Sequence, residues 1–289
     1  MRIRTILALG LAGVMSLAAC GKSGDDGEPT VTTSVEADVS VPGSPTFAAM
    51  EARGKVIVGV KEDQPNLGYK DPTTGKYSGF DIEIARMVAA QLGFGLDQIE
   101  YVAIPSANRE TAIAAGEIDY YVGTYSITDT RKQQVSFAGP YYIAGQDLLV
   151  RKDDNSITGE DSLTGKRICS VTGSTPAKRL KDKGLNVLEL EKYSLCVDQL
   201  LNNQTDAVTT DDAILKGYAA QNPDKLKVVG KPFSVEKYGI GLNKDDSALR
   251  NKINDILAES YEDGQWQDIY DSTLGKSGSD ASPPPLERY

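Results

Sequence analysis

Histidine is absent from this 289-residue chain, and only three cysteines, Cys20, Cys169 and Cys196, are present. The absence of an imidazole base excludes Ser-His-Asp and Cys-His catalytic groups. A zinc site draws its ligands mainly from cysteine and histidine, so this composition offers few ligands of either kind. We therefore expect neither a metal ion nor a cofactor in this protein.

Basic residues are also scarce, because 31 Lys and Arg face 41 Asp and Glu, which gives a net charge of −10. Removal of a leader that contains Arg2 and Arg4 would lower this charge to −12. An acidic body argues against nucleic-acid binding, which requires a basic surface. An anionic ligand would have to be held by local cations against the overall field.

The N-terminus has the pattern of an export signal. Residues 1–19 contain two arginines and a short apolar run, and they predict a signal peptide rather than a mature membrane span. The sequence Leu17-Ala18-Ala19-Cys20-Gly21 resembles a bacterial lipobox. This resemblance implies that Cys20 is lipidated and anchors the chain, because several acyl chains on one residue bind a membrane stably. An ordinary signal peptide that happens to end near a cysteine is the alternative.

Export bears directly on the other two cysteines. An extracytoplasmic space is oxidising, so Cys169 and Cys196 are expected to form a disulfide. Two free buried thiols are the alternative.

The composition divides the rest of the chain into a body between two polar segments. Residues 20–46 predict a lipidated cysteine followed by a flexible tether, and residues 276–289, with three consecutive prolines, predict a disordered tail. The body alternates β-branched runs with amphipathic stretches, which is typical of an α/β fold. Its length suits two lobes, which we place at 47–148 with 237–275 and at 149–236.

Particular elements follow from these patterns. The expected strands are 55–60, 99–102, 119–123, 165–171, 206–208 and 238–242, and the expected helices are 81–92, 109–115, a helix from 176, 248–259 and 264–274. The polar clusters Ser126-Ile127-Thr128 and Gly173-Ser174-Thr175 follow strands in different lobes. Ligands bind at such junctions, so both clusters predict a cleft between the lobes.

Three segments resemble one protein family. Gly79-Phe80-Asp81-Ile82-Glu83-Ile84-Ala85 is similar to its signature, Gly123 to Arg131 resembles its ligand loop, and Ser136 to Tyr142 resembles the segment after that loop. The family is the polar amino-acid group of bacterial extracellular solute-binding proteins, and the resemblance spans 47–274. It implies a two-lobed, periplasmic-binding-protein-like fold. Each lobe has a mixed sheet flanked by helices, and two hinge strands join the lobes.

The resemblance also implies which groups bind the α-carboxylate of an amino acid. Arg131 matches the family's carboxylate-binding arginine, and a bidentate guanidinium suits that role. The hydroxyls expected beside it are Ser126 and Thr128 in the first lobe and Ser174 and Thr175 in the second. A solvated surface arginine is the alternative for Arg131.

The α-ammonium group requires a carboxylate and carbonyl oxygens. Asp211 matches the family's ammonium-binding aspartate, and the carbonyl of Gly123 is its usual partner. Thr124, next to Gly123, is also expected among the ligand-binding residues. The neighbouring Asp212 is the alternative ligand, although it also suits a helix N-cap.

Two cations point to an acidic side chain on the ligand. Lys61 follows the first strand, where acidic-amino-acid binders carry a cation, and Ser106-Ala107-Asn108-Arg109 resembles a segment of glutamate and aspartate binders whose arginine reaches the distal carboxylate. Two cations would be left uncompensated by glutamine. The alternative is two surface cations, with Arg109 paired to Glu110 or Glu117. The absence of histidine leaves open the choice between glutamate and aspartate.

These expectations combine into a receptor rather than an enzyme. We expect a monomeric, lipid-anchored protein on the extracytoplasmic face of the cell membrane that delivers L-glutamate or L-aspartate to the permease of an ATP-driven (ABC) importer. The alternatives are a binder of glutamine or another polar amino acid, a sensory module for a membrane kinase, and a dehydratase-type enzyme on the same fold.

Overall fold

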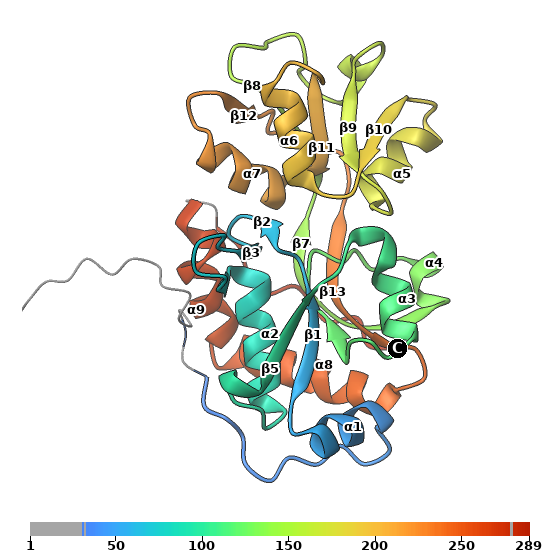
Figure 1. The fold of residues 1–289 in the computed structure, drawn as a ribbon, viewed down its shortest axis with the longest axis vertical. Helices are drawn as coiled ribbons and strands as arrows, with labels where there is room; N and C mark the ends of the chain where they lie inside the picture. Colours follow the sequence, from blue (N-terminus) through green and yellow to red (C-terminus); the bar gives the residue numbers. More distant parts are fainter. Residues whose placement is uncertain (1–30, 32, 278–279) are drawn as a thin grey trace, which may run out of the picture.

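The structure, a computed structural model, describes residues 31, 33–277 and 280–289. It has two α/β lobes, each built on a five-stranded mixed sheet flanked by helices (Figure 1). The predicted signal peptide and Cys20 lie outside the described residues. Within the described part of the chain, no helix is both long enough and apolar enough to cross a membrane.

The first lobe contains the N-terminal half of the body and the closing helices. Its sheet consists of β5 (Ile99–Ala103), β1 (Val56–Val60), β6 (Tyr120–Tyr121), β13 (Glu236–Asn243) and β7 (Val135–Ala144), in that spatial order. Strand β1 pairs in parallel with β5 and β6, whereas β13 is antiparallel to β6 and β7. The helices are α1 (Pro45–Arg53), α2 (Phe80–Gln91), α3 (Arg109–Ala114), α4 (Asp129–Lys132), α8 (Ser247–Glu262) and α9 (Gln265–Ser272). A small sheet of β2 (Asp63–Gln64), β3 (Gly68–Lys70) and β4 (Tyr77–Ser78) lies toward the second lobe (Figure 1).

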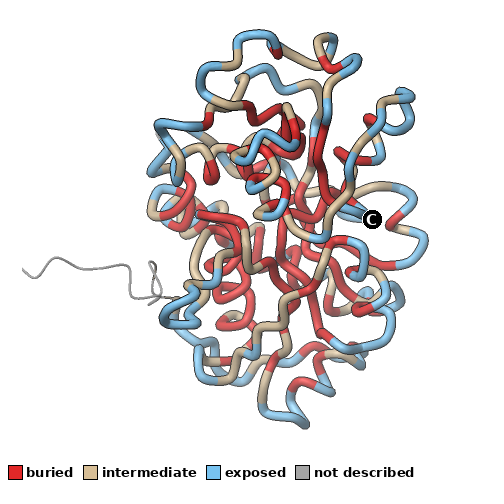
Figure 2. Tube along the Cα trace, turned by 45° about the horizontal axis from the view of Figure 1, so that its top comes forward, coloured by how far each residue is buried: buried red, intermediate tan, exposed pale blue. Residues whose placement is uncertain are grey.

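The second lobe repeats this architecture with a shorter chain. Its sheet consists of β10 (Val187–Leu190), β9 (Ile168–Val171), β11 (Ala207–Asp211), β8 (Gln146–Arg151) and β12 (Leu226–Val228). Its helices are α5 (Thr175–Asp182), α6 (Tyr193–Leu201) and α7 (Asp212–Gln221). Short 3₁₀ turns occur at Leu96–Gln98, Ser106–Asn108, Glu160–Leu163 and Leu274–Ser277. Buried segments run through the middle of both lobes, and exposed residues lie mainly on the outer loops (Figure 2).

Two adjacent strands connect the lobes. Strand β7 leads into β8 through Gly145, and β13 returns beside it, with Lys237 opposite Ile143 in the ladder. Because β8 begins at Gln146 and β13 at Glu236, both crossings lie slightly before the boundaries at 148 and 237 that the sequence predicted. These two paired strands are the hinge between the lobes (Figure 1).

The described end of the predicted tether is not free. Val41 is buried against the first lobe, and the backbone N–H of Glu36 donates to the carbonyl of Ala90 at 2.9 Å. Ser44 caps α1 by accepting a hydrogen bond from the N–H of Phe47 at 2.9 Å. The flexible segment that we predicted for 20–46 therefore ends earlier, because its valines have an apolar surface to cover.

The described part of the predicted tail, residues 280–289, also differs from the expectation of disorder. The N–H of Glu287 donates to the carbonyl of Gly139 at 2.9 Å, and the Tyr289 hydroxyl accepts from the N–H of Phe137 at 2.8 Å. Strand β7 is an edge strand of its sheet, so its outward groups lack a neighbouring strand. The C-terminal residues supply the missing partners.

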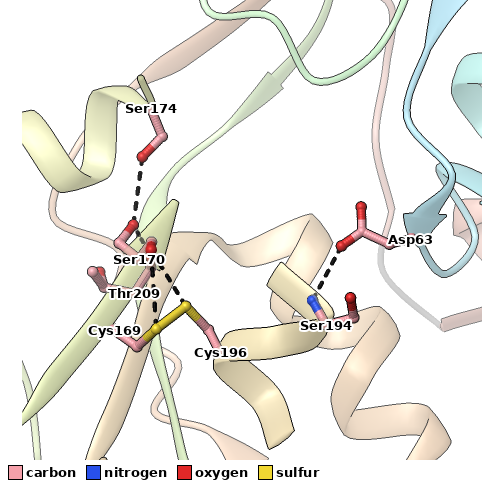
Figure 3. The surroundings of a disulfide bond; sticks show 7 residues. All are labelled: Asp63, Cys169, Ser170, Ser174, Ser194, Cys196 and Thr209. Atoms are coloured by element: carbon pink, nitrogen blue, oxygen red, sulfur yellow. Dashed lines mark hydrogen bonds between the residues drawn. A yellow bond between two sulfur atoms is a disulfide. The ribbon is translucent and has the colours of Figure 1, made fainter. Parts of the chain in front are cut away.

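The expected disulfide is confirmed. Cys169 in β9 and Cys196 in α6 are joined with their Cα atoms 5.5 Å apart, and both residues are fully buried (Figure 3). The bond ties α6 to the central region of the second-lobe sheet.

Reduction of this disulfide is expected to lower the free energy of unfolding by about 3–4 kcal/mol, because a loop of this size restricts the unfolded chain. Urea unfolding with and without a thiol reductant measures the change. The double variant Cys169→Ala/Cys196→Ala is the control, since its stability should not respond to the reductant. Unchanged stability of the wild type, with both thiols shown to be free by titration, would contradict the prediction.

Candidate ligand-binding site

A narrow pocket lies where the two lobes meet. Its first-lobe lining consists of Ser106, Arg109, Thr124, Ser126 and Arg131, and its second-lobe lining consists of Ser174, Thr175, Pro176, Tyr193, Asp211 and Ile214. The structure thus brings together eight of the eleven residues that the sequence predicted for the site. Lys61, Gly123 and Thr128 lie next to this lining rather than in it.

Arg131 is positioned by the short helix α4. Thr128 caps that helix by accepting from the N–H of Arg131 at 3.2 Å. The guanidinium donates to the carbonyls of Ser126 at 2.7 Å and Gly173 at 2.9 Å, and its Nε donates to Glu110 at 3.1 Å. Only 8% of Arg131 is exposed, so it is not the solvated surface arginine of the alternative. Burial, and then the nearby Arg109, lower the pKa of Arg131 to about 10, so it stays cationic at neutral pH.

Arg109 and Lys61 form a second group of buried cations. Arg109 is 2% exposed, donates through Nε to the carbonyl of Ser106 at 3.0 Å, and lies over the ring of Tyr125 with 4.2 Å from Cζ to the ring centroid. Lys61 is 6% exposed and donates to the Ser106 hydroxyl at 2.8 Å. The surface-cation alternative is therefore wrong for both residues. Glu110, its suggested partner for Arg109, pairs with Arg131 instead.

The proximity of these cations has an electrostatic consequence. Burial, and then the charge of Arg109, lower the pKa of Lys61 to about 7. Desolvated like charges repel each other, and a buried charge without a counter-ion is costly. The arrangement therefore favours a ligand that carries negative charge into the cleft.

Gly173 makes the contact between the lobes at the cationic side of the pocket. Its carbonyl accepts from Arg131 and, at 3.3 Å, from Arg109. Its φ of 78° lies in the left-handed region, and a Cβ there would come within 2.7 Å of the Cα of Ala107. Glycine is therefore required for the second lobe to approach this closely.

The predicted hydroxyls face each other across the cleft. Thr175 Oγ1 lies 3.3 Å from Ser126 Oγ and donates to Glu236 at 2.8 Å. Ser174 caps α5 by accepting from the N–H of Ala177 at 3.1 Å. These contacts place two second-lobe hydroxyls at the N-terminus of α5, opposite Arg131.

Asp211 ends β11 and is 3% exposed. Its Oδ2 accepts from the Tyr238 hydroxyl at 2.7 Å, while its buried Oδ1 has no hydrogen-bond partner. Burial, and then the charge of Glu236, raise the pKa of Asp211 to about 8. Asp212 lies outside the pocket lining, where it accepts from the N–H of Gly145 and from Lys216.

Sequence reasoning missed the residues that support the ligand loop from behind. Asp81 Oδ2 accepts from the N–H of Thr124 at 3.1 Å, and its Oδ1 accepts from the Tyr141 hydroxyl at 2.8 Å. The Thr124 hydroxyl donates to Gln64 at 3.1 Å, and Thr124 has a left-handed φ of 47°. Asp81 lies within the family-like segment 79–85, which was the available signal for it. Tyr193 and Tyr238 had no such signal.

Gly123 is required for packing at the start of the loop. A Cβ at this position would lie 2.7 Å from the Tyr121 hydroxyl oxygen. A side chain at this position would therefore displace the buried ring of Tyr121.

Comparisons with known proteins agree with this architecture. Residues 56–276 match the family model of bacterial extracellular solute-binding proteins, family 3. The chain is 42% identical over 289 residues to glutamate-binding protein GluB of Corynebacterium glutamicum, which covers 95% of this chain and 91% of that protein. It is 35% identical over 271 residues to the ABC transporter glutamine-binding protein GlnH of Bacillus subtilis, covering 93% and 96%.

A solved structure shows the same fold. A mutant of ArgBP from T. maritima superposes with a TM-score of 0.74 at 28% identity, over 80% of this chain and 99% of that one. The family match, the relatives and the two-lobed fold show that this chain belongs to the bacterial extracellular solute-binding proteins of family 3.

Proposed function

We propose that this protein is the amino-acid receptor of an ABC importer and that glutamate is its preferred ligand. The observation that carries the proposal is the charge gathered at one cleft. The buried side chains of Arg109 and Arg131 line it and Lys61 lies beside it, while the buried Asp211 opposite them has an oxygen without a hydrogen-bond partner. This charge set is complementary to a molecule with two carboxylates and one ammonium group.

Each charged group of glutamate has a partner in the proposed complex. Arg131 binds the α-carboxylate with the hydroxyls of Ser126 and Thr175, and Asp211 with the carbonyl of Gly123 binds the α-ammonium. Arg109 and Lys61, joined through Ser106, bind the distal carboxylate. These roles engage the charges of an amino acid itself, and the proposal does not include catalysis.

The names of the relatives support an amino acid as the ligand, but they differ in the amino acid. GluB is named for glutamate and GlnH for glutamine. The cations on the distal side separate these two ligands. Glutamine would place an uncharged amide beside Arg109 and Lys61 in a desolvated site, which favours glutamate.

The proposal extends to the location of the protein. Export by the segment 1–19 and lipidation of Cys20 would hold the receptor at the extracytoplasmic face of the cell membrane, where its closed form docks on the permease. A sensory module for a membrane kinase would use the same anchor, so permease and ATPase genes encoded beside this one would favour transport over signalling, and their absence would favour signalling.

Calorimetric titration of residues 21–289, stripped of co-purified ligand, tests the proposal. We expect glutamate to bind with a Kd in the micromolar range or below and glutamine at least about tenfold more weakly, because an unpaired buried charge costs several kcal/mol. Aspartate and asparagine complete the series. Tighter binding of glutamine would contradict the roles of Lys61 and Arg109, and no binding of any amino acid would contradict the proposed function.

Arg109→Gln provides the matching variant. It removes a distal charge and keeps a hydrogen-bonding side chain, so the preference for glutamate over glutamine should fall by about tenfold or more. Arg167→Gln is the control, because Arg167 is an exposed second-lobe arginine paired with Asp206. An unchanged preference in Arg109→Gln would show that Arg109 does not bind the distal carboxylate of the ligand.

A further inference from the structure

A second set of contacts between the lobes lies beside the pocket, where β2 of the first lobe meets α6 and α7 of the second. The backbone N–H of Ser194 donates to Asp63 Oδ2, a hydrogen bond drawn in Figure 3. The donor and acceptor atoms are 3.1 Å apart. The Tyr218 hydroxyl donates to the carbonyl of Asp63 and lies 3.2 Å from Asp63 Oδ2. Lys192 Nζ donates to Glu62 at 2.5 Å.

The contact at Ser194 satisfies a need of α6. The N-cap position of this helix is occupied by Lys192, whose side chain makes no capping hydrogen bond. The first N–H groups of a helix have no partner within the helix, and they are normally satisfied by an oxygen at the N-cap. Asp63 supplies that oxygen from the other lobe, and its negative charge suits the positive end of the helix.

Helix α6 is in turn linked to the pocket. Its first residue, Tyr193, lines the pocket, and Cys196 joins it to Cys169 in β9. Ser170, next in that strand, donates to the carbonyl of Thr209, and its Oγ lies 3.4 Å from the Oγ of Ser174 (Figure 3). The disulfide therefore makes α6 and the strand that leads into the second-lobe wall move together.

We propose that Asp63 is a cross-lobe N-cap that holds the two lobes closed and thereby sets how long a ligand stays bound. Opening of the lobes breaks the cap and leaves the first turn of α6 with unsatisfied N–H groups, while the disulfide keeps that turn in register with the pocket wall. Asp63 is a positioning residue, because it acts through α6 and has no place in the pocket lining.

The neighbouring ion pair provides a matched comparison. Glu62 and Lys192 also join the lobes, but their side chains are 28% and 40% exposed. Exposed pairs contribute little because water and salt screen them. The variant Glu62→Gln should therefore change closure much less than Asp63→Ala, although both substitutions remove a carboxylate at the same boundary.

Amide hydrogen exchange of residues 21–289, measured without ligand, tests the cap itself. The amide of Ser194 should exchange about fivefold faster in Asp63→Ala than in wild type. Loss of an N-cap raises the population of the opened first turn by about that factor, and exchange takes place from the opened state. Asp63→Asn keeps an acceptor oxygen and should exchange like wild type, as should Glu62→Gln. Tyr218→Phe, which removes the second contact to Asp63, should give an intermediate rate.

The dissociation rate of glutamate, measured by stopped flow, tests the consequence and rests on the proposed function. We expect glutamate to dissociate about fivefold faster from Asp63→Ala than from the wild type, and Asp63→Asn to restore the wild-type rate. Equal exchange at Ser194 in wild type and Asp63→Ala would overturn the inference, as would an unchanged dissociation rate. Equal effects of Asn and Ala would also overturn it, because the charge would then matter rather than the cap. Faster exchange in a protein that binds no amino acid would overturn the proposed function alone.

Discussion

The substitution Arg131→Ala is expected to raise the Kd for glutamate by about a hundredfold or more, because removal of one member of a buried, hydrogen-bonded charge pair costs several kcal/mol. Arg131 has both terminal nitrogens directed at the meeting point of the lobes, where they donate to the carbonyls of Ser126 and Gly173. Each terminal nitrogen carries a second N–H group, from which a carboxylate that enters the cleft can accept. The loss should apply equally to glutamate, aspartate and glutamine, since all three share the α-carboxylate.

The experiment is a calorimetric titration of the variant with each amino acid. Arg131→Lys separates charge from geometry, because lysine keeps the charge but cannot make two parallel hydrogen bonds, so it should recover a small part of the affinity. Arg151→Ala is the matched control. Arg151 also donates to two backbone carbonyls, those of Leu200 and Thr205, but within the second lobe away from the cleft. A Kd within about threefold of wild type in Arg131→Ala would remove this residue from the proposed site.

The sequence predicted the interior of the fold better than its ends. Strand β1 lies within the expected range 55–60 and α2 within one residue of 81–92, because runs of β-branched residues and helical spacing of apolar residues are local properties. The order of residues 280–289 depends on the open edge of β7, which is distant in sequence. Local composition therefore gave the wrong expectation for this segment.

The site was predictable to the extent that its residues belong to recognisable segments. Arg131 and Arg109 lie in such segments, and the structure places both in the pocket. The support of Thr124 by Asp81 joins residues 43 positions apart, and the hydrogen bond from Tyr238 to Asp211 crosses 27 positions and both lobes. Such partners are set by strand order and lobe closure, which no local pattern in one sequence reports.

The substitution Asp211→Asn is expected to move affinity and stability in opposite directions. Asparagine fills the same space and can still accept from Tyr238, but it cannot neutralise an ammonium group. The Kd for glutamate should therefore rise by about a hundredfold, as for other buried charge pairs that lose one member. Toward pH 8 the ligand-free protein should become more stable by on the order of 1–3 kcal/mol, because asparagine has no carboxyl group whose ionisation is opposed by burial.

The stability difference between Asp211→Asn and the wild type should depend on pH. The pKa of Asp211 is raised from its usual 3.8 to about 8, so over this range the folded protein retains a proton that the unfolded chain releases. Because of this difference, the contribution of Asp211 to the free energy of unfolding falls as the pH rises from 3.8 to about 8. The advantage of Asp211→Asn should therefore be small near pH 4 and grow toward pH 8. The raised pKa of Asp81 acts in the same direction but is common to both proteins and cancels in the difference.

Urea unfolding of the ligand-free proteins at several pH values, together with glutamate titration, measures both sides of the prediction. Asp212→Asn is the control, because Asp212 is the adjacent carboxylate but accepts from Gly145 and Lys216 outside the pocket lining. It should show neither the gain in stability nor the large loss of affinity. A loss of both stability and affinity in Asp211→Asn would mean that this carboxylate serves the fold. A gain of stability with a loss of affinity would mean that the protein keeps a destabilising buried acid because the ligand's ammonium group requires it.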